Sequence, residues 1–364
     1  MCLRIRRSNK NGGAVMVLWK EEIKFPDFEH FLDIRNIEFR TAHCLDEKGY
    51  HFLLGAAVVK YENTLRVSFA QSLKTENDDH TRLMEKVSFD GGFSWTENII
   101  AETEDGFGRS HGVYFPYQNE LYVFCPRARY DRIDRYPELK TEIYRLGNDG
   151  KYQLLGTALD GDFWPMCEPI ALENGTFLMA GLKTDSGTAA VALCDGTDIT
   201  KWNMTELPNP RNFRYWGETT VLRKENRLIT LVRKSGRIRN ILTSESTDNG
   251  ITWTRLSESD FPASHSKLYT GTLKNGLSYL VFNVRDRGER IGRDTLAIAV
   301  GYGVFERVYL IRDGFDGLPV FWQHNEWSYP YAFEDTEKDL LYIAYAKNKE
   351  HCEVAVIPTE SLLQ

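Results

Sequence analysis

Short runs rich in Val, Ile, Leu, Tyr and Phe alternate with turns of Gly, Asn and Asp along the chain, and no long segment has the 3.6-residue period of a helix. Many runs come in pairs, in which a polar or aromatic lead-in precedes an apolar strand, a tight turn and a second apolar strand. The pattern therefore predicts an all-β protein made of hairpins. The predicted hairpins span residues 40–57, which is the least regular copy, 110–125, 167–182, 217–233, 266–283 and 329–346.

These hairpins recur at intervals of roughly 50 to 70 residues, and most are followed by a further strand and an Asp-Gly turn. Four strands per repeat at this period are typical of a β-propeller, in which each blade buries its faces against its neighbours. We therefore predict a six-bladed β-propeller with four-stranded antiparallel blades, folded as one domain over residues 1–364. Residues 40–364 form the blades, and the segment 1–39 contains the strand that closes the ring, because an open ring leaves a sheet edge unpaired.

The pattern S-x-D-x-G-x-[ST]-W occurs twice, as SFDGGFSW at 88–95 and STDNGITW at 246–253, with a weaker copy at 194–202. In such a turn the Asp and Ser side chains bond the local backbone, Gly adopts a positive φ, and Trp packs between blades. The pattern resembles the Asp box of the sialidase and BNR-repeat superfamily, which implies a turn between the third and fourth strands of a blade. The motif is structural and identifies no substrate, because Asp boxes occur in enzymes and in binding propellers alike.

Charge and composition exclude several kinds of partner. The formal net charge is -7 and the basic residues are scattered, so a nucleic acid is not expected to bind. No apolar run approaches the roughly 18 residues of a membrane helix, and the N-terminal stretch GAVMVLW is short for a secretory signal and lacks a small-residue cleavage site. We therefore expect a cytoplasmic protein without a membrane partner. The six cysteines stand singly, without the spacing of a zinc site or a disulfide framework.

Strand alternation predicts where a site can lie. The start of each blade's first strand and the end of its second strand share one face of a propeller, and the S-x-D turns lie on the other face. Polar residues are dense at these positions, which indicates a binding face. The candidates at first-strand starts are Arg40, His43, His111, Glu168, Glu218, Lys267 and Tyr329, and those at second-strand ends are Arg127, Lys183, Arg233 and Asn283.

Glu218 and Arg233 begin and end one predicted hairpin, so strand pairing can bring the carboxylate and the guanidinium together. The spacing resembles the sialidase pattern in which a Glu about fifteen residues before an Arg positions a tyrosine nucleophile, while the Arg holds the substrate carboxylate. A structural salt bridge is the alternative interpretation. Arg293, which precedes an apolar strand, is similar to another arginine of the sialidase triad, with Arg285, Arg287 and Arg290 as competing candidates.

The resemblance also implies the remaining catalytic groups. Tyr329 lies at about the distance after Arg293 at which sialidases place their nucleophile, with Tyr331 as second choice. Asp79, in the sequence TENDDHTR shortly before the first S-x-D turn, is the expected acid, although a polar loop also explains that sequence. The first arginine of the triad is expected at Arg40, with Arg35 as a rival, since the family's Phe-Arg-Ile-Pro lead-in is only partly kept in Phe39-Arg40-Thr-Ala.

We therefore predict a glycoside hydrolase that releases a terminal acidic sugar, such as sialic acid, from a glycan, without a metal or an organic cofactor. Two alternatives remain open at this stage. His43 and His111 open predicted first strands in adjacent blades, as in propeller lyases and rhamnosidases that act on rhamnose and uronate glycans with His and Tyr. A non-catalytic propeller that binds carbohydrate is the other alternative. The oligomeric state is not predicted.

Overall fold

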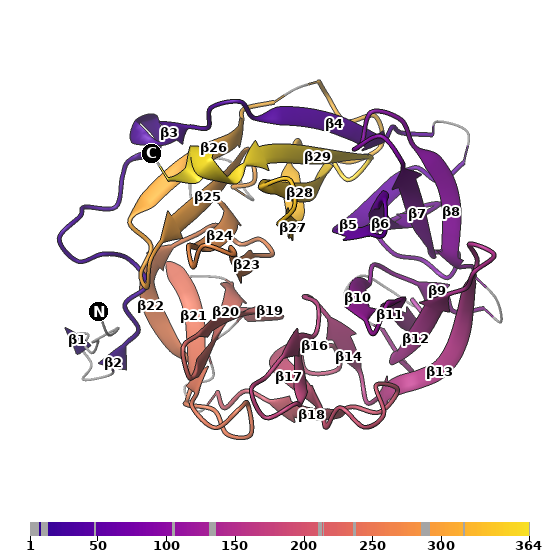
Figure 1. The fold of residues 1–364 in the computed structure, drawn as a ribbon, viewed down its shortest axis with the longest axis horizontal. Helices are drawn as coiled ribbons and strands as arrows, with labels where there is room; N and C mark the ends of the chain where they lie inside the picture. Colours follow the sequence, from indigo (N-terminus) through magenta and orange to yellow (C-terminus); the bar gives the residue numbers. More distant parts are fainter. Residues whose placement is uncertain are drawn as a thin grey trace.

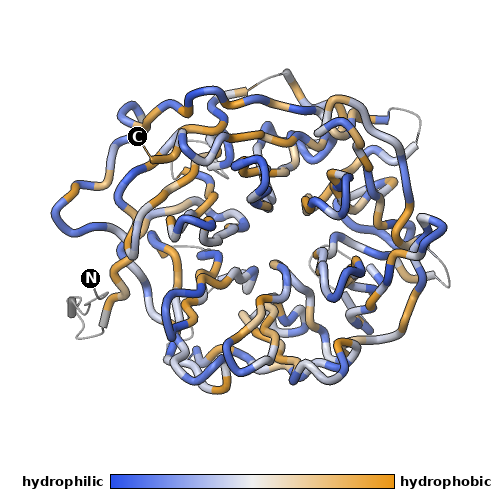
Figure 2. The backbone as a smooth tube through the Cα atoms, in the orientation of Figure 1, coloured by the Kyte–Doolittle hydropathy of each residue, from blue (hydrophilic) through white to orange (hydrophobic). Residues whose placement is uncertain are grey.

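The computed structural model describes residues 7–8, 14–46, 49–103, 106–130, 136–209, 213, 215–235, 238–284, 292–315 and 317–363. In this part of the chain six sheets of four or five strands surround a central axis, which confirms the predicted six-bladed propeller (Figure 1). The sheets are antiparallel apart from one short parallel pairing. Hydrophobic and hydrophilic stretches alternate around the whole ring (Figure 2), as expected for strands that pack between neighbouring blades.

The first three blades follow the chain in order. Blade one contains β5 (Phe52–Tyr61), β6 (Thr64–Ser72), β7 (Arg82–Ser88) and β8 (Thr96–Ala101). Blade two contains β10 (Val113–Tyr117), β11 (Glu120–Ala128), β12 (Lys140–Leu146) and β13 (Tyr152–Asp160), with the short β9 (Gly108–Arg109) paired to β11. Blade three contains β14 (Phe163–Pro165), β15 (Ile170–Ala171), β16 (Phe177–Lys183), β17 (Thr188–Cys194) and β18 (Asn203–Glu206), where β14 and β15 both pair with β16.

The last three blades complete the ring. Blade four contains β19 (Tyr215–Lys224), β20 (Arg227–Lys234), β21 (Asn240–Ser246) and β22 (Ser257–Pro262). Blade five contains β23 (Tyr269–Thr272), β24 (Ser278–Asn283), β25 (Thr295–Gly301) and β26 (Arg307–Asp313), and β3 (Leu32–Asp33) pairs with β26 in parallel. Blade six contains β27 (Trp327–Asp335), β28 (Leu340–Lys347), β29 (His351–Pro358) and, as its outer strand, β4 (Glu38–His43).

The N-terminal segment runs along the outer rim and closes the ring (Figure 1). β4 pairs antiparallel with β29, so one sheet joins the two ends of the chain. β1 (Arg7–Ser8) and β2 (Ala14–Val15) form a separate two-stranded sheet. The helical turns of the described residues are the 3-10 segments η1 (Phe28–His30) and η2 (Thr359–Leu362), and no helix there is long and apolar enough to span a membrane.

One predicted hairpin is wrong. Residues 40–57 do not pair with each other, because β4 belongs to blade six and β5 begins blade one. The first hairpin is β5 and β6, and the closing strand β4 begins at Glu38, inside the predicted segment 1–39, and continues to His43. The error arises because an outer strand with one buried face has the same alternation as the start of an inner strand.

The two S-x-D turns fold alike between the third and fourth strands of blades one and four. In the first copy the N–H of Gly92 donates to Ser88 Oγ at 2.7 Å, and the N–H of Ser94 donates to Asp90 at 2.9 Å. In the second copy the corresponding donors are Gly250 and Thr252, at 2.9 Å each. Each turn therefore satisfies its own backbone and leaves the opposite face of the blades free for a site.

Candidate active site

A cavity of about 440 Å³ lies where the first strands begin and the second strands end. All six blades contribute to its lining, which contains three carboxylates, three Arg or Lys side chains, three histidines and six Trp or Tyr rings. Such a mixture of aromatic faces with a few charged groups is typical of a site for a small polar ligand. The cavity is the candidate active site.

The innermost strands of three blades are irregular where they reach this cavity. Their pairing with the second strand shifts register between positions 54 and 56, 215 and 219, and 328 and 331. Bulges of this kind redirect side chains and are frequent next to active sites. Tyr329, within the third irregularity, has a φ of 55°, which residues with a side chain rarely adopt. The inner strands therefore depart from regular pleating at the positions that carry the site.

Tyr329, Glu218 and Arg233 form the first polar cluster of the cavity. The Tyr329 hydroxyl donates to Glu218 Oε1 at 2.7 Å, and Arg233 donates to Glu218 Oε2 at 2.6 Å. All three side chains are buried, with residue exposures of 7%, 3% and 8%. Because each carboxylate oxygen of Glu218 has its own donor, the carboxylate is fixed between the tyrosine and the arginine.

The pKa values of this cluster follow from burial and charge. Burial alone raises the pKa of Glu218, but the Arg233 guanidinium, the Tyr329 hydroxyl and Arg293 outweigh it, so the pKa lies below its ordinary value. Burial and the neighbouring Glu218 carboxylate raise the pKa of Tyr329 well above its ordinary value. Glu218 is therefore ionised at neutral pH and accepts a hydrogen bond from a neutral phenol.

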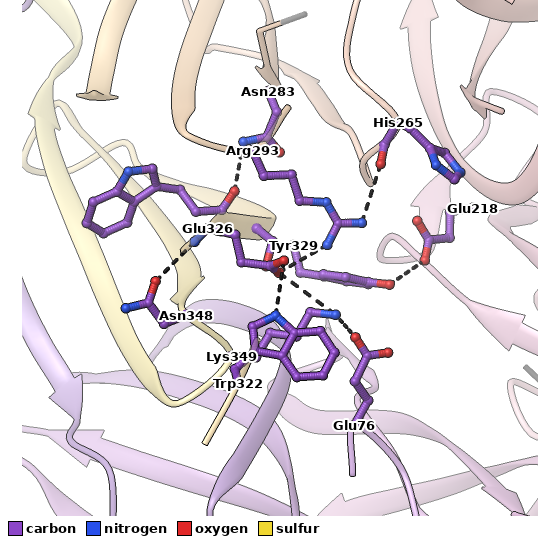
Figure 3. A network of polar contacts seen from close by, with 12 residues as sticks. Glu76, Glu218, His265, Asn283, Arg293, Trp322, Glu326, Tyr329, Asn348 and Lys349 are labelled. Carbon is purple, nitrogen blue, oxygen red and sulfur yellow. Dashed lines mark hydrogen bonds and ion pairs between the residues drawn. The ribbon is translucent and has the colours of Figure 1, made fainter. Parts of the chain in front are cut away.

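A second polar network adjoins the first (Figure 3). Arg293 donates to Glu326 Oε1 at 3.0 Å and its Cζ lies 5.8 Å from the centre of the Tyr329 ring. Lys349 Nζ lies 3.8 Å from the same Glu326 oxygen and forms an ion pair with Glu76. Trp322 Nε1 donates to Glu326 at 3.4 Å. Two cations from blades five and six therefore flank the tyrosine ring.

Several buried polar nitrogens of the cavity lack a partner among the described residues. These are Nε of Arg233 and of Arg293, Nε2 of His265 and both ring nitrogens of His111. Burial, followed by the charge of Lys267, lowers the pKa of His111 to about 3. Burial, followed by Arg233 and Arg293, lowers that of His265 to about 3. Both imidazoles are neutral at pH 7, and the unpartnered groups are suited to a polar ligand.

The cavity brings together five of the ten predicted site residues, namely Tyr329, Glu218, Arg233, Arg293 and His111. Tyr331, the second choice for the nucleophile, is buried against Tyr269 with ring centres 4.6 Å apart and does not line the cavity. The competing arginines Arg285, Arg287 and Arg290 lie outside the described residues.

Arg40 and His43 do not reach the cavity, so the prediction that they open a first strand at the site is wrong. Both lie on β4, the outer strand of blade six. Arg40 pairs with Glu38 and its Cζ lies 3.9 Å from the centre of the Phe93 ring, next to the S-x-D turn on the other face. His43 is buried, with Nε2 3.2 Å from the side-chain nitrogen of Gln71. Arg35, the rival of Arg40, also lies outside the cavity lining.

Asp79, the predicted acid, does not line the cavity either. Another acidic residue of the same loop lines it instead. Asp79 accepts the N–H of Tyr130 at 2.8 Å, which ties the loop to blade two. Asp78 accepts the backbone N–H groups of Leu73 and His80 at 3.1 and 2.8 Å, which folds the loop on itself. The loop acid that reaches the cavity is Glu76.

Glu168 and Lys267 lie beside the candidate site without lining it. Glu168 accepts the hydroxyl of Tyr269 at 2.7 Å and lines a different cavity of about 540 Å³. Lys267 is buried and donates to the backbone oxygen of Pro330 at 3.1 Å, directly behind Tyr329. Burial lowers the pKa of Lys267 to about 8. The cavity lining therefore does not support the prediction that Glu168 and Lys267 contact the substrate.

Sequence reasoning missed several residues that line the cavity. Glu76, Glu326 and Lys349 lie in turns or segments between strands, where periodicity gives no direction for a side chain. His265 lies two residues before the predicted Lys267, so the strand-start rule selected the wrong residue of that segment. Within the described ranges no group of three His, Cys, Asp or Glu side chains is arranged to hold a metal ion.

A second cavity of about 350 Å³ adjoins the first. The two share Glu76, Asn77, Tyr136 and Trp322 in their linings. The rest of the second lining contains three further aromatic rings, those of Phe52, Tyr130 and Phe321. Glu76 therefore lies at the junction of a charged cavity and an aromatic one.

Comparison with known proteins agrees with the fold. Residues 164–343 match the BNR repeat-like domain. A protein of unknown function from Dyadobacter fermentans DSM 18053 has a TM-score of 0.67 and 14% identity, over 89% of this chain and 99% of that one. A Hadza microbial sialidase has a TM-score of 0.67 and 13% identity, over 88% of this chain and 68% of that one.

Trypanosoma rangeli sialidase, solved with 2,3-difluorosialic acid as a covalent intermediate, has a TM-score of 0.65 and 14% identity over 91% of this chain. The match spans about 60% of the length of that enzyme. No curated protein sequence matches the chain. The BNR repeat-like match thus covers just under half of the chain, and this chain shares its β-propeller fold with these sialidases.

Proposed function

We propose that the protein is a glycoside hydrolase that releases a terminal 2-keto sugar acid, such as sialic acid, from a glycan. The observation that carries this proposal is the 2.7 Å hydrogen bond from Tyr329 to Glu218 beside Arg233 and Arg293. A sugar of this class carries its carboxylate on the anomeric carbon. A nucleophile for that carbon and cations for the carboxylate must therefore converge on one point, as these four side chains do.

Arg233 and Arg293 are the groups that bind the substrate carboxylate. Both guanidinium groups retain a buried Nε without a partner among the described residues. A guanidinium stays charged at all working pH values, and its planar N–H groups match a planar carboxylate. Their own ion pairs with Glu218 and Glu326 hold them in place before substrate arrives.

Tyr329 is the nucleophile and Glu218 is its base. As the phenolic oxygen forms a bond to the anomeric carbon, its proton passes to Glu218 Oε1 and the bond to the leaving oxygen breaks. A neutral phenol avoids the repulsion that a carboxylate nucleophile would meet from the substrate carboxylate. Because the pKa of Tyr329 is raised, the proton moves as the new bond forms and not before.

Glu76 is the group that protonates the leaving oxygen. That oxygen joins the acidic sugar to the rest of the glycan. The residue that protonates it must therefore lie between the region that binds the acidic sugar and the region that binds the rest of the glycan. Glu76 belongs to the linings of both the charged cavity and the aromatic cavity. In the second step the same carboxylate takes a proton from water, which hydrolyses the bond to Tyr329 and regenerates the phenol.

The lyase alternative has less support. A lyase needs a base whose pKa lies near the working pH, whereas burial holds the pKa of His111 at about 3. His111 also lacks an orienting partner among the described residues, and His43, the other predicted base, lies on the outer strand β4. A non-catalytic propeller has no need of a buried Tyr-Glu-Arg cluster, which costs desolvation free energy.

Mass spectrometry of products tests the proposed function. The protein is incubated with sialylated and uronate-containing oligosaccharides, with a Tyr329→Phe variant as control. Products that sum to the substrate plus one water, including a free acidic monosaccharide, are expected from the wild type alone. Products that sum to the substrate mass, one of them unsaturated, would establish the lyase instead. Absence of cleavage across the panel would contradict a hydrolase and favour a binding propeller.

A further inference from the structure

Lys349 is a buried lysine in the lining of the first cavity, and burial lowers its pKa to about 7. It follows Asn348 in the turn between β28 and β29, both with positive φ, and its side chain is 5% exposed. Its Nζ pairs with Glu76, lies 3.8 Å from Glu326, and stands 4.3 Å from the centre of the Trp322 ring. It thus links the leaving-group acid to the carboxylate that holds Arg293.

The charges of the cavity balance before substrate enters. Its lining contains three carboxylates, Glu76, Glu218 and Glu326, and three Arg or Lys side chains, Arg233, Arg293 and Lys349. With all six ionised the net charge of this set is zero. The substrate carboxylate adds one negative charge, which a poorly solvated cavity does not tolerate without compensation. One proton taken up by a cavity carboxylate restores the balance.

Glu76 is the carboxylate suited to take that proton. Glu218 and Glu326 are 2% and 1% exposed at the side chain and each accepts a hydrogen bond from an arginine. The Glu76 side chain is 29% exposed, and its ion pair in the described part of the chain is with Lys349. Its ionised form therefore depends mainly on one ammonium group.

We propose that Lys349 exchanges partners when substrate binds. This inference rests on the proposed function. The substrate carboxylate at Arg293 attracts the Lys349 ammonium away from Glu76, and Glu76 takes a proton from solvent in its place. That proton is the one Glu76 later gives to the leaving oxygen. Lys349 then serves as the third cation for the substrate carboxylate. Among the described residues, the first blade contributes Leu54, Glu76 and Asn77 to the cavity lining, and none of these is a cation.

The groups that face Lys349 permit this exchange. Glu76 approaches from the segment between β6 and β7, Glu326 from the segment before β27, and Tyr329 from β27, with its ring centre 5.9 Å from Nζ. Arg293 bonds the same Glu326 oxygen that lies 3.8 Å from Nζ. A carboxylate on Arg293 therefore arrives next to the ammonium without rearrangement of the backbone.

Calorimetry of binding tests the exchange directly. A 2,3-didehydro sugar acid, which carries the carboxylate but is not cleaved, is titrated at pH 7 into wild-type protein in buffers of different ionisation enthalpy. The dependence of the binding enthalpy on buffer gives the number of protons taken up. We expect about one proton for the wild type and for Lys349→Arg, whose guanidinium cannot itself take up a proton, and none for Glu76→Gln, which has no carboxylate to protonate. Lys347→Met, two residues away and paired with Glu353, is the matched control and should behave as the wild type.

Kinetics give an independent measure. Lys349→Met should lower kcat/KM by about 10- to 100-fold, as expected for the loss of one hydrogen bond to a charged group. Lys349→Arg should restore most of the loss. Equal proton uptake in the wild type and Glu76→Gln, or no uptake in a wild type that binds the analogue, would overturn the exchange. A wild type that neither binds the analogue nor cleaves glycans would instead overturn the proposed function.

Discussion

The hydroxyl of Tyr329 lies 2.7 Å from a carboxylate oxygen of Glu218, although 111 residues separate the two in sequence. Blade six supplies the tyrosine and blade four the glutamate, so the contact exists only when the ring is closed. Arg233 holds the other oxygen of the same carboxylate. A phenol, a carboxylate and a cation thus meet at one point of the cavity.

Tyr329→Phe removes the proposed nucleophile and keeps the ring whose centre lies 5.5 Å from that of His111. We expect hydrolysis to fall by about 10³-fold or more, because the other groups of the site act through the bond that Tyr329 forms. Thermal unfolding should change little. Initial rates and a melting curve measure both effects, and a variant that retains a tenth of wild-type activity would rule out Tyr329 as the nucleophile.

Glu76→Gln removes the proposed proton donor. A glycan with a poor leaving group should be cleaved about 10²- to 10⁴-fold more slowly, whereas an aryl glycoside, which leaves without a proton, should be cleaved at nearly the wild-type rate. Asp79→Asn is the control in the same loop, since Asp79 bonds the backbone of Tyr130 and does not line the cavity. If Asp79→Asn and not Glu76→Gln produced this dependence on the leaving group, the acid would be misassigned.

Gly55→Ala tests the irregularity of β5 between positions 54 and 56, where Gly55 packs against the His111 ring. Gly55 has a φ of 59°, and an added Cβ would lie 2.1 Å from Cγ of His111. We expect a loss of about 1 kcal/mol of stability from the backbone conformation and a further 1 to 3 kcal/mol from overpacking. Gly175→Ala is the matched control, because Gly175 has a φ of 83° and no atom within 4 Å of the added Cβ. Urea denaturation that shows equal losses in both variants would contradict the tight contact at His111.

His111→Phe separates hydrolase from lyase and also tests the buried imidazole. Both ring nitrogens lack partners among the described residues, so a phenyl ring loses no such hydrogen bond and can keep the contacts with Trp164 and Tyr329. The hydrolase account predicts activity within about tenfold of wild type, since no proton moves to His111 in the proposed reaction. A loss of about 10³-fold would favour a histidine base.

The same variant should alter the pH dependence of stability. The unfolded imidazole takes up its proton near pH 6.5, whereas folded His111 stays neutral down to about pH 3. Stability is therefore lost as the pH falls from 6.5, and His111 accounts for about 2 kcal/mol of the loss between pH 7 and pH 5. The His111→Phe variant should therefore lose about 2 kcal/mol less stability than the wild type between pH 7 and pH 5. Equal losses in urea denaturation would show that His111 titrates normally.

The sequence predicts those parts of the site that lie on paired strands. Glu218 and Arg233 could be paired because they belong to one hairpin, in which Thr219 lies opposite Val232. The propeller was predictable because blades repeat the same order of hairpins and turns. Strand alternation placed Tyr329 at the start of a first strand, but its role as nucleophile followed only from resemblance to a family, since no local pattern links blade six to blade four.

The closing strand, Glu76 and Lys349 could not be placed from the sequence, because their positions depend on long-range pairing and on loop conformation, which a hydrophobic pattern does not indicate. The closing strand β4 pairs with β29, more than 300 residues away, so its Arg40 was assigned to the wrong blade. Glu76 reaches the cavity because Asp78 folds its loop, and neither acid differs in sequence from a solvated one. Lys349 lies in a turn, where lysine is usually exposed.

Covalent labelling of Tyr329 tests the central claim most directly. The 2,3-difluoro derivative of the sugar acid identified by product analysis is incubated with the wild type and with Tyr329→Phe, followed by intact mass measurement and peptide mapping. We expect the wild type to gain the mass of one fluorinated glycosyl group on the peptide that contains Tyr329, and the variant to gain none. An adduct on another residue, or cleavage of the natural substrate without any adduct, would contradict the assignment of Tyr329 as the nucleophile.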